Sequence, residues 1–96
     1  MSYKIVYDRQ AIKDIKKLKS SGLDGKAKSL IDVIREDPFE NPPRYEALVG
    51  NLSGLYSRRI NIQHRLVYRI YQEPFTEGDI QYDGYIKIVR MWTHYE

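Results

Sequence analysis

The sequence contains no cysteine. A disulfide framework, a thiolate metal site and a cysteine nucleophile are therefore excluded, and the absence suits the reducing cytoplasm, where we expect the protein to reside. No apolar run approaches the roughly 18 residues that a transmembrane helix needs, and the opening residues 1–7 are too polar for a signal peptide. We therefore expect a protein with no membrane partner.

Several motifs of common enzyme classes are also missing. The chain has neither a GxGxxG nor a GxxxxGK[ST] loop to cradle phosphates, and it lacks the G-x-S-x-G turn of many serine hydrolases. The two histidines, His64 and His94, stand far apart in the sequence, and no carboxylate cluster lies near either. We therefore expect neither a metal ion nor a cofactor.

Acidic residues are absent from residues 47–72, and this segment holds four arginines, so that it carries a charge of +4 within a chain of net charge +3. The excess positive charge is thus confined to one segment. The planar guanidinium group of arginine suits phosphate. A solvated basic strand face, or arginines paired with acids of the helices, would explain the same charges.

The 96 residues suffice for one domain, 1–96, and the composition is that of a soluble globular protein. Alternation predicts a strand over residues 3–7. Asp8 is a suitable N-cap for a helix that ends at residues 20–22, and a second helix spans about 24–36, where Asp37-Pro38 stops it. Apolar residues recur at helical spacing in both helices: Ala11, Ile12, Ile15 and Leu18, then Ala27, Leu30, Ile31 and Ile34.

The second half of the chain is rich in strand-forming residues. We expect one short helical turn at 45–49, strands at 55–60 and 65–71, a polar turn at 73–79 and a last strand at about 82–92. The order strand, helix, helix, three strands predicts an α+β fold, with two N-terminal helices packed on one face of a twisted, mainly antiparallel sheet. The first strand must pair within that sheet, at a position that periodicity does not give.

The available side chains suffice for one kind of chemistry, the cleavage of RNA without a metal. Such cleavage needs a base to activate the attacking hydroxyl and an acid to protonate the leaving oxygen. It also needs cations to stabilise the extra negative charge of the transition state. RNA supplies its own nucleophile, the ribose 2′-hydroxyl, so arginine, histidine, tyrosine and a single glutamate are enough.

One long motif is specific. The segment 51–60 (NLSGLYSRRI), followed by HRLVY at 64–68 and by His94-Tyr95, resembles the signature of YoeB-like toxins, which belong to the RelE group of bacterial type II toxin–antitoxin systems. The Asp37-Pro38-Phe39 break and the later Glu46 match as well, so the resemblance covers essentially the whole chain. It implies a small RelE-like α+β toxin that cleaves mRNA on the translating ribosome, without a metal, and that a cognate antitoxin inhibits.

The resemblance also implies roles for individual residues. Glu46 matches the general base that takes the proton of the 2′-hydroxyl, and His94 matches the general acid that protonates the 5′-leaving oxygen. Arg65 matches the arginine that stabilises the pentavalent phosphate, and Arg59 a second arginine in contact with phosphate. Tyr95 matches the terminal tyrosine that positions the substrate, by stacking on a base.

Two further residues, Arg58 and Lys87, are candidates for substrate binding. Arg58 points away from Arg59 if the strand is regular, which favours a structural role or a contact with the antitoxin. Val49 stands where many family members carry a lysine, and Lys87 or Arg90 could replace that lysine. The chain also continues to Glu96, where many relatives end on the tyrosine.

The neighbours of Tyr68 are apolar, which predicts that its ring lies in the core. His64 follows a predicted strand and precedes the next, so we expect a structural role for it in the hairpin between them. Neither residue is therefore expected to take part directly in catalysis.

Other functions remain open at the level of sequence. RelE-fold relatives of the ParE type bind DNA gyrase and cleave no RNA, and a basic RNA-binding module needs no acid–base pair. The expected partners are mRNA, the ribosome and an antitoxin with an acidic, partly disordered segment that folds on binding. A homodimer is a further possibility.

Overall fold

The computed structural model describes residues 2–92, so that the predicted site residues His94 and Tyr95 lie outside the described part of the chain. Two helices follow the first strand, and five more strands follow the helices. The elements in chain order are β1 (Ser2–Tyr7), α1 (Arg9–Ser21), α2 (Asp24–Glu36), β2 (Tyr45–Ala47), a 3-10 turn (Gly50–Leu52), β3 (Leu55–Arg59), β4 (Arg65–Tyr71), β5 (Phe75–Glu77) and β6 (Ile80–Arg90).

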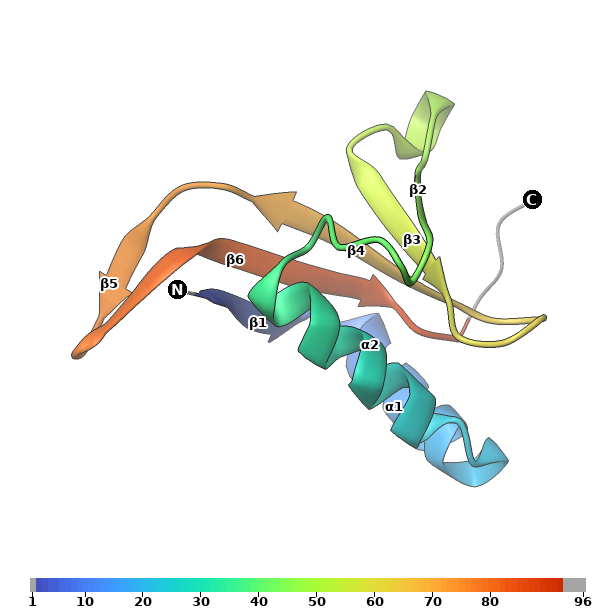
Figure 1. The fold of residues 1–96 in the computed structure, drawn as a ribbon. Coiled ribbons are helices and arrows are strands. Elements are labelled where there is room, and N and C mark those ends of the chain that lie inside the picture. The colour runs from blue at the N-terminus through green and yellow to red at the C-terminus, as the bar shows by residue number, and fades with distance from the viewer. Residues whose placement is uncertain (1, 93–96) are drawn as a thin grey trace.

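The strands form one sheet in the order β1-β6-β4-β3-β2, and β5 pairs with the first part of β6. β1 runs parallel to β6, and every other pair is antiparallel. Both helices lie against the same face of the sheet, and the β5–β6 hairpin extends beyond them (Figure 1). The predicted α+β class is therefore confirmed, and β1 takes the edge position that periodicity could not give.

The helix α1 begins and ends as predicted. The Asp8 side chain accepts a hydrogen bond from the Arg9 backbone N–H at 2.8 Å, and Gly22 ends the helix with a positive φ of 76°. The predicted buried face is wrong at one position, because Ile12 is 53% exposed. The carboxylate of Asp14 takes a place in that face and is fully buried.

The core lies between the helices and the sheet. The α2 side chains Ala27, Leu30, Ile31 and Ile34 are all buried, as the spacing predicted. They pack with side chains of one face of the sheet, among them Leu66, Tyr68, Ile86 and Ile88. Tyr68 is fully buried, which confirms its predicted place in the core. The opposite face of the sheet is covered by neither α1 nor α2 (Figure 1).

Two local predictions were wrong. Residues 45–47 form strand β2 and not a helical turn, because Glu46 pairs with Ser57 and extends the sheet beyond β3. The segment predicted as a polar turn contains strand β5, whose Phe75 ring stacks on Tyr82 with centroids 5.1 Å apart. Within residues 2–92, neither helix is long and apolar enough to cross a bilayer.

Candidate active site

The uncovered face of the sheet brings the predicted site residues of three strands together. Successive residues of a strand point to opposite faces, so Ser57 and Arg59 of β3 share a face, as do Arg65 and Val67 of β4. Arg59 pairs with Arg65, and Ser57 pairs with both Val67 and the β2 residue Glu46. The register alone therefore places Glu46, Arg59 and Arg65 on one side of the sheet, away from the helices.

These residues line a cleft of about 360 Å³. Its six lining residues are Pro43, Arg44, Glu46, Ser57, Arg59 and Arg65. The Arg65 Nη1 atom lies 3.7 Å from the Glu46 Oε2 atom and 3.4 Å from the Ser57 Oγ atom. The Arg65 side chain is 17% exposed and that of Glu46 is 46% exposed, so both are held by neighbours yet open to a ligand.

The cleft has the charge pattern of a phosphate site with one built-in base. Three arginines surround a single carboxylate, so a bound phosphodiester meets cations on several sides. The carboxylate can accept a proton from a hydroxyl placed between it and the phosphate. Arg44 lines the cleft too, but the ion pair of Glu46 in the described residues is with Arg65.

Arg58 lies elsewhere, and its prediction as a substrate-binding residue is corrected. Its side chain is 1% exposed, on the face of β3 that meets the core. Its guanidinium donates hydrogen bonds to the Tyr68 hydroxyl at 2.9 Å, to the Pro38 carbonyl at 3.0 Å and to the Pro43 carbonyl. It also lies 5.0 Å from the ring centroid of Tyr45. Arg58 therefore ties the loop before β2 to the sheet.

Lys87 and Arg90 of β6 do not reach the cleft. Lys87 pairs with Arg69, which follows Arg65 by four residues on β4, or about 13 Å at the usual rise of a strand. Arg90 points to α1, where its Nε atom donates to the Asp14 carboxylate at 2.9 Å. Neither residue takes the place of a lysine beside the cleft, and Val49 is 82% exposed.

Trp92, two residues after the end of β6, lies against His64, the residue before Arg65. The pairing of β4 with β6 ends at Val67 and Arg90. The Trp92 ring stacks on the neighbouring His64, with ring centroids 3.8 Å apart. His64 is buried, and its contact with Trp92 supports the structural role predicted for it.

A comparison with models of protein families shows to which family the chain belongs. The family model described as the YoeB-like toxin of bacterial type II toxin–antitoxin systems matches residues 7–95. The chain belongs to the YoeB-like toxins. The match includes the cleft residues and continues through the C-terminal His94-Tyr95.

Individual relatives agree with this assignment. A YoeB toxin of Synechocystis is 56% identical over 41 residues, which cover 43% of this chain and 48% of the relative. A YoeB toxin of Escherichia coli K12 is 49% identical over 45 residues, which cover 47% of this chain and 54% of the relative. This YoeB-like toxin thus spans about half the length of the curated relatives it matches.

Solved structures of other toxins share the whole fold. A YoeB/ParE toxin from Agrobacterium tumefaciens has a TM-score of 0.75 and 26% identity, and the match covers 96% of this chain and 99% of that one. A YoeB dimer from Staphylococcus aureus has a TM-score of 0.70 and 33% identity, with 97% and 98% covered. A YoeB–YefM complex from the same organism is similar at 32% identity and a TM-score of 0.70 over 97% and 98%.

The sequence prediction missed one residue of this YoeB-like toxin that bears on the site. The buried Asp14 accepts hydrogen bonds from the backbone N–H groups of Met91 at 2.9 Å and Trp92 at 3.2 Å. Burial on its own raises the pKa of Asp14, but the hydrogen bonds from Arg90, Met91 and Gln10 together outweigh it and leave the pKa below its ordinary value of 3.8. Its position three residues after Ala11 and four before Leu18, within the buried helix face, was the available signal.

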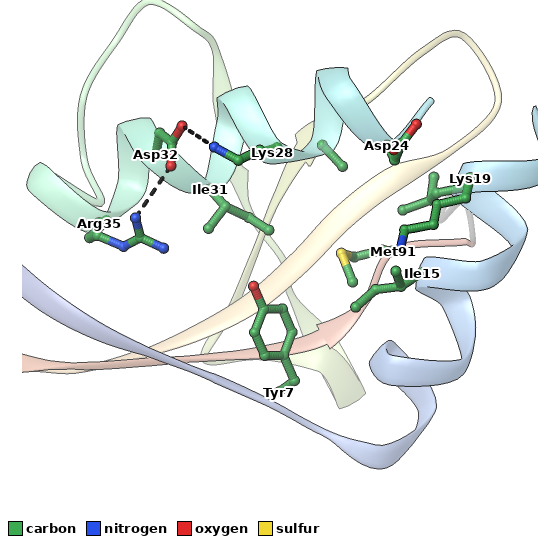
Figure 2. A pocket seen from close by; sticks show the side chains of 11 residues that line it. Tyr7, Ile15, Lys19, Asp24, Lys28, Ile31, Asp32, Arg35 and Met91 are labelled. Atoms are coloured by element: carbon green, nitrogen blue, oxygen red, sulfur yellow. Dashed lines mark hydrogen bonds and ion pairs between the residues drawn. The ribbon is translucent and has the colours of Figure 1, made fainter. Parts of the chain in front are cut away.

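A second cleft, of about 330 Å³, lies between the two helices. Tyr7, Ile15 and Met91 point into it, and Asp32 pairs with Lys28 and Arg35 on its rim (Figure 2). Lys28, Asp32 and Arg35 are paired with one another within α2, and the interior of the cleft is mostly apolar. The second cleft therefore lacks the three arginines around a single carboxylate that line the first.

Proposed function

We propose that this YoeB-like toxin is a metal-independent, ribosome-dependent endoribonuclease that cleaves mRNA. The observation that carries the proposal is the cleft in which Glu46 lies 3.7 Å from Arg65, with Arg59 and Arg44 at its edge. A protein that only binds gyrase or RNA needs no lone carboxylate among phosphate-binding arginines. No metal is required, because Glu46 and His94 supply proton transfer and the arginines supply charge stabilisation.

The proposed reaction is one transfer of the phosphoryl group within the RNA. Glu46 takes the proton of the ribose 2′-hydroxyl, and the 2′-oxygen attacks the neighbouring phosphorus. The bond between phosphorus and the 5′-oxygen breaks, and His94 donates a proton to that oxygen. The products are a 2′,3′-cyclic phosphate, which water can open to a 3′-phosphate, and a 5′-hydroxyl.

The cations and the terminal tyrosine complete the proposed site. Arg65 is held between Glu46 and Ser57, and this position suits contact with both the attacking oxygen and the phosphate. Arg59 is exposed at the cleft edge and binds a phosphate oxygen, where negative charge increases in the transition state. Tyr95 positions the substrate by stacking on a base.

The proposed partners follow from the relatives and from charge. The Staphylococcus aureus relative was solved as a dimer and in a complex with YefM, and we infer that this toxin likewise binds a cognate antitoxin and can form a homodimer. An acidic, partly disordered antitoxin segment would fit the arginine-lined cleft and block it. The reaction needs translating ribosomes, so the proposed location is the cytoplasm.

Ribosomes programmed with one defined mRNA test the proposal. The wild-type toxin should cut the mRNA within or beside the A-site codon, and Arg65→Ala should lower the cutting rate by about 100-fold or more. Addition of the antitoxin should stop the cut. Intact mRNA together with inhibited DNA gyrase would instead assign the toxin to the ParE type.

A further inference from the structure

The C-terminal residues that the proposed function uses follow directly on a structural clamp at the end of β6. The clamp consists of the Asp14 carboxylate, the Arg90 guanidinium and the backbone N–H groups of Met91 and Trp92. One carboxylate oxygen, Oδ2, accepts from Arg90 Nε at 2.9 Å, from Met91 N at 2.9 Å and from Trp92 N at 3.2 Å. The clamp thus joins the middle of α1 to the last described residues of the chain.

Arg90 makes a second contact within the clamp, to the carbonyl of Trp92. While its Nε atom donates to Asp14, its Nη2 atom donates to the Trp92 carbonyl at 3.1 Å. The N–H and the carbonyl of Trp92 are therefore both held, and the His64 ring packs on the indole at 3.8 Å. The backbone at Trp92 has no freedom to turn without breaking a charged hydrogen bond.

The clamp lies close to the cleft. The Trp92 ring stacks on His64, which immediately precedes the cleft residue Arg65 in the chain. His94 follows Trp92 by two residues, and two residues of chain reach about 7 Å at most. The clamp therefore fixes the backbone at Trp92, two residues before His94 in the sequence.

We propose that Asp14 is a positioning residue for catalysis: by holding the backbone of Met91 and Trp92, it places His94 to protonate the 5′-leaving oxygen. This inference rests on the proposed function, in which His94 is the general acid. A small displacement of a general acid slows the chemical step and leaves substrate binding nearly unchanged. We therefore expect Asp14→Asn to lower kcat by about 10- to 100-fold at an unchanged KM.

A substrate that needs no acid separates positioning from stability. The test mRNA carries sulphur in place of the 5′-bridging oxygen at the cleaved position, because a thiol is acidic enough to leave as a thiolate. The measured quantity is the ratio of the cleavage rates of the sulphur and oxygen mRNAs. The amount of folded enzyme cancels in this ratio, so a variant that is only less stable keeps the wild-type value.

Three variants complete the design. His94→Ala should raise the ratio strongly, because the oxygen substrate alone loses its acid. Asp14→Asn should raise the ratio in the same direction. The matched control is Asp32→Asn on α2, an exposed aspartate that pairs with Lys28 and Arg35 (Figure 2) and, in the described part of the chain, makes no hydrogen bond to the clamp residues, and it should keep the wild-type ratio.

The outcomes distinguish the two ideas. A raised ratio for His94→Ala and an unchanged ratio for Asp14→Asn overturns the positioning role and leaves the proposed function intact. An unchanged ratio for His94→Ala overturns the acid role itself, and with it this inference. If Asp14→Asn fails to fold, Arg90→Gln replaces it, because this change loosens Trp92 while the carboxylate stays in place, and it should also raise the ratio.

Discussion

Replacing the adjacent arginines Arg58 and Arg59 by alanine should have different effects: Arg58→Ala should lower stability, and Arg59→Ala should slow cleavage. Arg58 is buried and gives hydrogen bonds to the Tyr68 hydroxyl and to the carbonyls of Pro38 and Pro43. Arg59 is exposed at the edge of the cleft. The pair therefore contrasts a stabilising cation with a proposed substrate-binding one at neighbouring positions of the same strand.

The expected loss for Arg58→Ala follows from its three acceptors. A buried acceptor left without its donor costs about 1–3 kcal/mol, and the removed donor was charged. The Pro43 contact is only partly buried, so water can replace that donor at low cost. We expect the free energy of unfolding to fall by about 4 kcal/mol, which lowers the Tm of a domain of this size by about 15 °C or more.

Urea unfolding and thermal melts measure the loss, and the ribosome assay measures activity on the folded fraction. Arg58→Lys keeps the charge but cannot reach all three acceptors, so its free energy of unfolding should lie between those of the wild type and Arg58→Ala. Arg59→Ala should change stability by no more than about 0.5 kcal/mol while slowing cleavage. A stable, inactive Arg58→Ala together with an unstable Arg59→Ala would refute the assignment of the two faces.

Three further predictions test other parts of the molecule. Glu46→Gln should slow cleavage about 100-fold or more with an unchanged melting temperature, and a loss of activity explained by unfolding would count against its role as base. The pKa of Asp14 is lowered in the folded state, so its carboxylate contributes stability at neutral pH that is lost as the pH falls below about 3.8. The difference in free energy of unfolding between the wild type and Asp14→Asn, measured in urea, should therefore shrink in acid. A difference that stays constant from pH 7 to pH 3 would contradict this. Gly84→Ala should destabilise by about 3 kcal/mol, since a Cβ there would lie 2.0 Å from the Tyr71 carbonyl oxygen, and an unchanged urea midpoint would disprove that contact.

The helices and the long strands could be predicted because their signals are local. Asp8 caps the N-terminus of α1 and Gly22 caps its C-terminus, and the apolar spacing of α2 corresponds to its buried side chains. Strand β2 escaped prediction because three residues show no clear alternation and owe their conformation to pairing with β3. The short strand β5 is likewise stabilised by its partner β6, through contacts such as Phe75 on Tyr82.

The site could be predicted only in part. Strand alternation indicated that Arg58 and Arg59 point to opposite faces, but not that loop carbonyls would surround Arg58. Asp14 was missed because a carboxylate in a lysine-rich helix is typical of a solvated surface. Its partners, the backbone of Met91 and Trp92, are more than seventy residues away in sequence, and no local pattern reveals such a contact.

The central claim is that the ribose 2′-hydroxyl attacks the phosphate in the cleft of Glu46 and Arg65. The most direct measurement uses ribosomes programmed with an mRNA that carries a single 2′-deoxynucleotide on the 5′ side of the cleaved bond. We predict that the wild-type toxin leaves this mRNA intact and cuts the all-ribose mRNA into a 2′,3′-cyclic or 3′-phosphate and a 5′-hydroxyl end. Cleavage of the deoxy-substituted mRNA at the same position, or a 5′-phosphate on the product, would contradict the account.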